Sequence, residues 1–194
     1  MKYTNKVRIV CLMHIFTWPF AIISKMAVKL FSSERIFAFS TQLLSLVPGM
    51  TGQYLRASFY KQILHESDYD LAVGFCSFFA HPAASVGKGV VITSFSIIGT
   101  AIIENNVLIS ARVSILSGKY QHGKGFKEKS DDITRSEYIQ VRIGENSWLG
   151  EGSIVMANVG KNCIVSAGSV VTKNMPDNMI AIGNPARFLK RGEV

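Results

Sequence analysis

The fold is decided by residues 143–154, which read IGENSW and then LGEGSI, two six-residue steps that open at Ile143 and Leu149. Each step runs apolar residue, glycine, two variable residues, serine. The six-residue repeat resumes at residues 159–164 and 165–170, which read VGKNCI and VSAGSV. Earlier steps open at Val86, Ile92, Ile98, Ile103, Ile109 and Ile115. A period of six fits neither an α-helix nor one alternating strand, and it is typical of short strands joined by turns in a wound parallel β-helix. The expected fold class is therefore mainly β.

The side-chain sizes within each step indicate how a coil is filled. The apolar opener points into the prism and a small residue shares the interior; these small residues are Ser147, Ser153, Cys163 and Ser169. Glycine or asparagine is expected at the corners, where φ can be positive. One coil cannot bury its own apolar face, so the coils must stack. The step is one residue short from Ile98 to Ile103 and two short from Val155 to Val159, which predicts altered corners there.

Length, charge and cysteine content limit the classes of function. A chain of 194 residues allows one core and an appendage. The net charge of +8 predicts an acidic partner, either membrane lipid or a phosphorylated ligand. Nucleic acid is disfavoured, because the basic residues are scattered and no recognition helix is present. Cys11, Cys76 and Cys163 lack metal-like spacing and no secretory cleavage pattern precedes them, so they are interpreted as reduced cytosolic thiols.

The chain divides near residue 70 into an apolar, basic, helical segment, residues 1–70, and a repeat domain, residues 71–194. Residues 9–23 are almost continuously apolar, and Pro19 is expected to break any single long helix there. This run is shorter than the about 20 residues that span a bilayer. Two more helices are expected at residues 37–47 and 52–64.

Basic residues flank the apolar run on both sides: Lys2, Lys6, Arg8, Lys25 and Lys29. A basic-flanked segment too short to span is expected to lie in the membrane interface. The alternative is a helix packed on the β-helix or at a subunit contact. The expected location is cytoplasmic, peripheral to the inner face of the cell membrane.

A long insertion, about residues 118–140, separates the two repeat blocks. Such loops in a tightly periodic fold are usually binding or catalytic. The loop contains His122, whose neutral imidazole could accept a proton from a hydroxyl or amine nucleophile. The alternative is that His122 is an exposed loop histidine with no catalytic role. Asp131, Asp132 and Glu137 share the loop and are expected to be solvated, although one could orient the imidazole.

The residue pattern offers no metal site. His81 and His122 are the only histidines of the repeat domain, and no cysteine clusters with them, so a three-histidine site is not available within one chain. Cys163 occupies the inward small position of its step and is interpreted as core filler, not as a nucleophile.

The most specific strings are WLGEGSIV at 148–155, IVSAGSVVTKNMPDN at 164–178 and AIGNPARFLKR at 181–191. They resemble the closing coils of the hexapeptide-repeat acyltransferases, and ENNVLISARVSILSGKYQHG at 104–123 resembles the segment that carries that family's catalytic histidine. The resemblance covers about residues 84–191. Within the family, the chain is most similar to O-acetyltransferases of polysaccharide and lipopolysaccharide pathways.

The resemblance implies a left-handed parallel β-helix in a homotrimer, with acetyl-CoA in the cleft between subunits and no metal. His122 would be the general base. Trp148 would line the site, or else be a corner aromatic between stacked coils. The turn of Ser166, Ala167 and Gly168 would lie along the pantetheine arm, and the implied partners of the CoA phosphates are Lys173, Arg187 and Lys190. Ser166 stands where the family usually has glycine.

Three functional hypotheses follow. The first is an acetyl-CoA-dependent O-acetyltransferase that acts by direct transfer on a sugar hydroxyl in surface polysaccharide or lipopolysaccharide biosynthesis, including lipid-linked acceptors. The second is an N-acetyltransferase that acts on an amino-sugar nucleotide. The third is a catalytically inactive β-helix scaffold, which the presence of both His122 and the closing motif disfavours.

Overall fold

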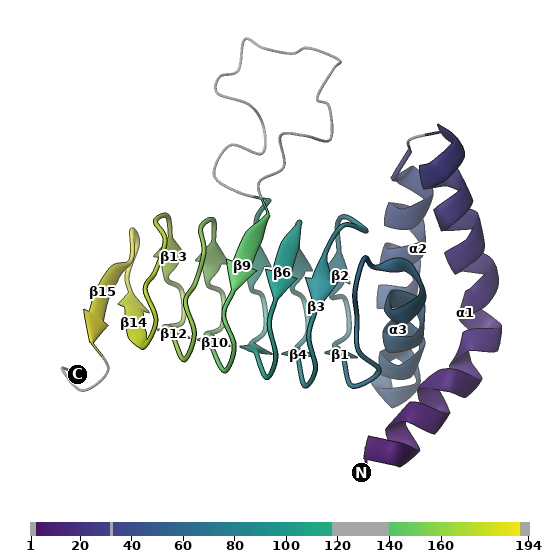
Figure 1. The fold of residues 1–194 in the computed structure, drawn as a ribbon, viewed down its shortest axis with the longest axis horizontal. Coiled ribbons are helices and arrows are strands. Elements are labelled where there is room, and N and C mark those ends of the chain that lie inside the picture. Colours follow the sequence, from purple (N-terminus) through teal and green to yellow (C-terminus); the bar gives the residue numbers. More distant parts are fainter. Residues whose placement is uncertain (1–2, 32, 118–139, 191–194) are drawn as a thin grey trace.

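The computed structural model describes residues 3–31, 33–117 and 140–190. Three helices, α1 (Tyr3–Phe31), α2 (Arg35–Ser45) and α3 (Gly49–Ile63), cover one end of a column of β-coils (Figure 1). The predicted break of the first helix at Pro19 was wrong, because α1 continues through this proline. Figure 1 shows α1 bent along its length, which is how a helix accommodates a proline.

The coils are built from two- to four-residue strands, wound so that each strand pairs with its counterpart one coil away. In the described residues they form three sheets. One has the order β1 (Ala72–Val73), β4 (Val91–Ile92), β7 (Leu108–Ile109), β10 (Trp148–Leu149), β12 (Ile164–Val165), β14 (Met179–Ile182) and β15 (Arg187–Lys190). The second has β2 (Phe78–Phe79), β5 (Ile97–Ile98), β8 (Ser114–Ile115), β11 (Ile154–Val155) and β13 (Val170–Val171). The third has β3 (Ser85–Val86), β6 (Ala101–Ile103) and β9 (Val141–Ile143).

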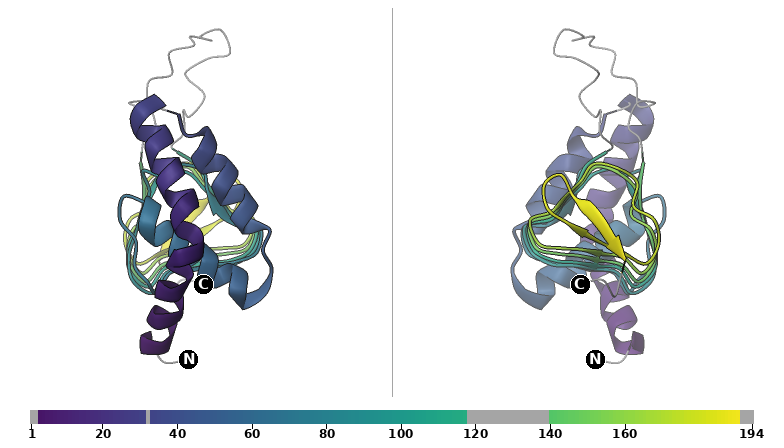
Figure 2. Two further views of the ribbon diagram at one scale, coloured as in Figure 1. Left: turned by 90° about the vertical axis from the view of Figure 1, so that its right-hand side faces the viewer. Right: turned by 90° about the vertical axis from the view of Figure 1, so that its left-hand side faces the viewer.

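The predicted β-helix is confirmed by this pairing. All described pairs are parallel except β14 with β15, which is antiparallel and closes the far end of the column. Viewed along the column, the coils superpose in a triangular outline (Figure 2). We call the three sheets the seven-, five- and three-stranded sheets of the described chain.

The interior is filled as the step pattern predicts. The openers are buried one above another, as in the column of Ile98, Ile115, Val155 and Val171. The small residues Ser147, Ser153, Cys163 and Ser169 are each at most 1% exposed. Because every coil buries its apolar side chains against the next, stability accumulates along the stack.

Asparagine and glycine have different roles at the corners. Asn106, Asn146, Asn162 and Asn178 adopt positive φ at one edge, and their side-chain amides form a hydrogen-bonded ladder along the column. Gly144 does not adopt a positive φ. A Cβ there would lie 2.4 Å from the carbonyl carbon of Gly160 in the next coil, so this glycine is required by close stacking.

The short steps fall at one edge of the prism. Ile98–Ile103 and Val155–Val159 both cross from the five-stranded to the three-stranded sheet. Ser117 and Gln140, the described residues on either side of the insertion, lie at this same edge between β8 and β9. The predicted altered corners and the insertion therefore share one edge, because coil length can change there without disturbing the other two corners.

Candidate functional site

Two cavities lie at opposite ends of the coil column. The far-end cavity, of about 480 Å³, is lined by Thr172, Lys173, Ile182, Gly183, Asn184, Pro185, Ala186 and Arg187. The helical-end cavity, of about 520 Å³, is lined by Val28, Glu34, Ile63, His65, His81, Pro82, Ala83, Thr100 and Gln140. Both contain groups that could bind or react with a ligand.

The far-end cavity is shaped by the hairpin of β14 and β15. Gly183 has a φ of +99°, a conformation that glycine accepts without steric cost. Its N–H donates to Ser169 Oγ at 3.0 Å, and the N–H of Ala186 donates to the carbonyl of Val170 at 2.9 Å. These bonds hold the hairpin turn against the last coil. Two cations, Lys173 and Arg187, consequently line one cavity although 14 positions separate them in the sequence.

The other residues expected around the cofactor do not line this cavity. Ser166, Ala167 and Gly168 form the corner between β12 and β13, at the edge where the seven- and five-stranded sheets meet. Lys190 is the last residue of β15 and pairs with Met179. Within one chain, Lys173 and Arg187 therefore line the cavity, whereas the 166–168 turn lies beside it, with the N–H of Ser166 donating to the carbonyl of Ala181.

Trp148 lies on the outer surface of the seven-stranded sheet, in β10, and is 46% exposed. Its indole N–H donates to Ser110 Oγ at 2.8 Å, which orients the ring. Leu108 precedes it in the ladder and Ile164 follows it. The alternative of a corner aromatic was wrong, since Trp148 is in a strand. The outer surface of this sheet therefore offers an aromatic face to a ligand or a neighbouring subunit.

The predicted catalytic residue, His122, lies outside the described residues, as do Asp131, Asp132 and Glu137. The insertion that carries them begins after Ser117, whose hydroxyl accepts a hydrogen bond from the backbone N–H of Thr100 at 2.8 Å. It ends before Gln140, whose side-chain amide donates to the carbonyl of Ala83 at 3.1 Å. Both anchor points are thereby fixed to coils on the helical side of the column, Ser117 to the adjacent coil and Gln140 to the coil beyond it.

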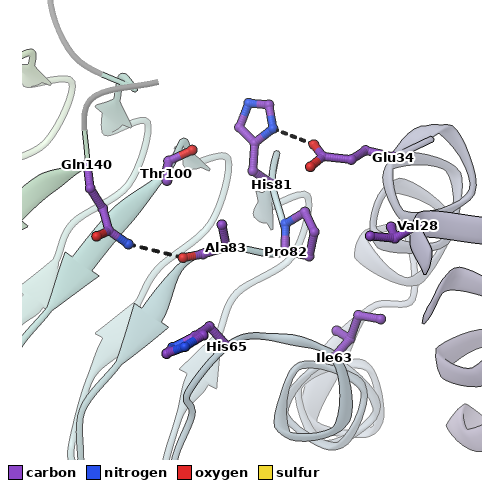
Figure 3. A pocket seen from close by; sticks show the side chains of 9 residues that line it. All are labelled: Val28, Glu34, Ile63, His65, His81, Pro82, Ala83, Thr100 and Gln140. Carbon is purple, nitrogen blue, oxygen red and sulfur yellow. Dashed lines mark hydrogen bonds and ion pairs between the residues drawn. The ribbon is translucent and has the colours of Figure 1, made fainter. Parts of the chain in front are cut away.

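The helical-end cavity contains a histidine–carboxylate pair that sequence reasoning missed. His81 Nδ1 lies 2.7 Å from Glu34 Oε2, and Figure 3 shows the two side chains directed toward each other at the cavity rim. His65, on the opposite side of the cavity, lies 3.2 Å from Ser85 Oγ through its Nδ1. The sequence shows His81 followed by Pro82, but it gives no indication of Glu34, which lies 47 residues earlier.

The described residues contain no cluster of histidine, cysteine and acidic side chains that could hold a metal ion. Cys163 is fully buried, and its thiol lies 3.1 Å from the carbonyl oxygen of Pro176. Burial raises the pKa of this thiol. A buried thiol with a raised pKa is a poor nucleophile, which agrees with its interpretation as core filler.

Comparisons with known proteins agree with the repeat and the fold. A family model described as the hexapeptide repeat of succinyl-transferase matches residues 140–173. A maltose O-acetyltransferase from Clostridium difficile 630 is 24% identical with a TM-score of 0.67, over 87% of this chain and 91% of that protein. A galactoside acetyltransferase in complex with coenzyme A is 20% identical with a TM-score of 0.64, over 81% and 80%.

A hexapeptide-repeat-containing acetyltransferase from Vibrio cholerae is 17% identical with a TM-score of 0.56, over 82% of this chain and 91% of that protein. No curated protein sequence matches the chain. The predicted hexapeptide repeat and left-handed β-helix are confirmed by these matches.

Proposed function

From this shared fold and the cationic cavity at its far end, we propose that the protein transfers an acetyl group from acetyl-CoA to a sugar hydroxyl. The observation that carries the proposal is the convergence of Lys173 and Arg187 on a cavity beside the closing hairpin. Two cations on a pocket of this size suit the phosphates of a CoA-type donor. The fold match to a maltose O-acetyltransferase and to a galactoside acetyltransferase in complex with coenzyme A supports it.

The reaction is direct transfer. His122 accepts the proton of the acceptor hydroxyl while the hydroxyl oxygen forms a bond to the thioester carbonyl carbon. The C–S bond then breaks, and the departing thiolate takes up the proton, so that free CoA and an O-acetyl sugar are the products. Backbone N–H groups would stabilise the tetrahedral oxyanion. The acceptor class we propose is a glycan of surface polysaccharide or lipopolysaccharide biosynthesis, lipid-linked acceptors included.

We also propose that the protein is a homotrimer, which is the assembly that the family resemblance implies. The 166–168 turn lies one coil below the closing hairpin, since the N–H of Ser166 donates to the carbonyl of Ala181 and Arg187 pairs with Ile182. A homotrimer would bring the outer strands of neighbouring coil columns into contact. Exposed apolar residues on the outer strands, among them Leu108 and Ile154, fit such contacts. Light scattering that returned the mass of one chain, 21.4 kDa, would exclude this arrangement.

The activity is tested by incubating the purified protein with acetyl-CoA and a panel of sugars, oligosaccharides, sugar nucleotides and lipid-linked sugars. We expect free-thiol release together with a mass gain of one acetyl group on an acceptor hydroxyl. Acetylation confined to the amine of an amino-sugar nucleotide would favour the second hypothesis. Neither turnover nor CoA binding would favour the scaffold.

Lys173→Ala and Arg187→Ala are each expected to weaken acetyl-CoA binding by about tenfold, because each removes one charge-assisted contact to a phosphate. Turnover at saturating donor should change little, since neither side chain touches the reacting atoms. Calorimetry with CoA and with 3′-dephospho-CoA identifies the phosphate concerned.

Lys161→Ala is the matched control, because Lys161 is an exposed cation that does not line the far-end cavity. Its Nζ lies 3.9 Å from Glu104 Oε2. Its donor affinity should equal that of the wild type. Unchanged affinity in both Lys173→Ala and Arg187→Ala would show that the phosphates bind elsewhere.

A further inference from the structure

The outward face of α1 exposes a continuous set of large apolar side chains. Within the described chain, 13 of the 21 exposed large hydrophobic residues lie between Leu12 and Met50. The outer α1 face, as we call it, consists of Leu12, Ile15, Phe16, Trp18, Ile23 and Met26, which are 53–73% exposed. Contiguous apolar surface of this kind marks an interaction site.

The opposite face of α1 is already occupied. Val10, Ala21 and Ala27 are buried, and Thr17 Oγ1 lies 2.8 Å from Ser58 Oγ of α3. Ser24 Oγ lies 3.2 Å from Ser40 Oγ of α2. The helix is therefore apolar on both sides but buried on only one. Because a helix that is apolar all round is normally covered all round, the outer α1 face lacks its cover.

The charges around this face are of one sign. Residues 1–33 contain no aspartate or glutamate. Arg8 lies toward one end of the apolar face, with Lys25 and Lys29 toward the other, and all three are exposed. Among the described residues they form no ion pair, whereas Lys6, on the packed side, pairs with Asp70 at 2.9 Å. An apolar face with a cationic rim matches a surface of anionic headgroups over acyl chains.

We propose that the protein docks on an anionic lipid surface through the outer α1 face, with α1 in the plane of the interface and not across the bilayer. By length and composition α1 could span, since residues 5–30 form one sufficiently apolar helix. The expectation that the segment is too short to span was therefore wrong as to length. What opposes spanning is its packed face, because extraction would break the bonds to Ser58, Ser40 and Asp70.

Docking through this face sets the orientation of the whole molecule. Figures 1 and 2 show α1 as the outermost helix, running across the end of the coil column. A lipid surface that contacts it would meet the column end-on. The far-end cavity then faces away from the membrane, and the helical-end cavity lies near it. This arrangement would place the phosphates of a bound donor at the end of the coils that faces away from the membrane.

A second copy of the chain is the competing occupant of the outer α1 face. Two such faces in contact would bring two cationic rims together with no carboxylate in residues 1–33 to offset them. Like charges in contact disfavour that association. Anionic lipid, which is concentrated in the cytoplasmic leaflet, has the complementary sign.

The first test is flotation of the full-length protein with vesicles of phosphatidylcholine alone or with one-third phosphatidylglycerol. We expect binding to the anionic vesicles that weakens with salt. The triple variant Ile15→Gln, Phe16→Gln, Ile23→Gln should lose binding, because it removes apolar area that already faces solvent. Its thermal transition should match that of the wild type. Deleting residues 1–30 is a poorer test, since it also uncovers α3.

Charge is tested with two matched triple variants. Arg8→Gln, Lys25→Gln, Lys29→Gln should lower the vesicle partition coefficient by about 10- to 100-fold. Lys88→Gln, Arg112→Gln, Lys161→Gln removes the same charge from exposed positions on the coils and should leave partitioning within about twofold. An equal fall of the partition coefficient in both variants would show that binding depends on net charge alone, and it would overturn the proposed role of α1.

Depth distinguishes an interfacial from a spanning helix. The chain has two tryptophans, so Trp148→Phe leaves Trp18, at the middle of α1, as the fluorophore. We expect a blue shift on anionic vesicles and quenching by lipids brominated near the headgroup. Stronger quenching by lipids brominated near the chain end would place Trp18 at the bilayer centre and overturn the in-plane arrangement. If the wild type does not bind lipid but self-associates, and the Ile15, Phe16, Ile23 variant does not self-associate, the occupant of the outer α1 face is a second copy of the chain.

Discussion

His122→Ala is expected to lower turnover by about two to four orders of magnitude while leaving acetyl-CoA affinity near that of the wild type. The alanine cannot accept the proton of the acceptor hydroxyl, whereas donor binding depends on groups elsewhere. The wild-type kcat/KM should rise with pH and level off as the imidazole becomes neutral, and the variant should lack that limb. Stopped-time assays of thiol release across pH, combined with calorimetry, measure both quantities.

His81→Ala is the informative comparison for this prediction. His81 is the described histidine with a carboxylate partner, Glu34 at 2.7 Å, and this geometry is typical of an oriented general base. If His122 is the base, His81→Ala should retain the rise of kcat/KM with pH. A larger fall in kcat for His81→Ala than for His122→Ala would move the chemistry to the helical-end cavity. Equal loss of donor binding in His122→Ala would indicate a structural role.

Arg56→Met is expected to lower the free energy of unfolding by at least about 3 kcal/mol, because it leaves several buried carbonyl groups without their charged donor. Arg56 is 1% exposed and donates from α3 to α2, to the linker between α2 and α3, and to β1. Its Nη1 lies 2.9 Å from the carbonyl oxygen of Leu44 and 2.8 Å from that of Val47, and its Nε lies 2.9 Å from that of Val73. Urea unfolding followed by circular dichroism measures the loss.

The physical basis is a helix end capped by a distant side chain. The carbonyls at the C-terminal end of α2 lack the regular bonds of the helix interior; that of Leu44 accepts a 3.3 Å bond from the Val47 N–H, and a cation there also offsets the helix dipole. Burial lowers the pKa of the Arg56 guanidinium, so its hydrogen bonds must offset the cost of desolvation. Gly52 permits the approach, since a Cβ there would lie 1.9 Å from the carbonyl oxygen of Val47.

Arg35→Met is the control for Arg56→Met. Arg35 is an exposed arginine at the start of α2, and its loss should cost no more than about 0.5 kcal/mol. Arg56→Lys should recover part of the stability, because an ammonium group can bond some but not all of these carbonyls. If Arg56→Met lowers the free energy of unfolding no more than Arg35→Met does, the buried guanidinium does not hold helices α2 and α3 to the coils.

The repeat domain could be predicted because its information is periodic and local. Each opener, such as Ile143 or Leu149, is buried for the same reason in every coil, so the pattern specifies the fold several times over. The strings 164–178 and 181–191 likewise indicated a closing turn with nearby cations; Lys173 and Arg187 line one cavity, and their binding of phosphates stays a prediction. The sequence also indicated the long insertion and His122, but it does not specify where the His122 side chain lies.

Contacts between distant segments could only be decided by the tertiary structure. Sequence spacing did not predict that Glu34 would meet His81, or that Arg56 would reach α2 and β1, since each contact depends on how the helices pack on the first coil. The same packing keeps α1 helical through Pro19 and selects which of its apolar sides is buried. Periodicity determined the coils by itself, because neighbours in the stack repeat in the sequence. The packing of the three helices, the buried Arg56 and the outer α1 face each occur once and do not repeat in the sequence. Only side-chain packing in three dimensions can specify them.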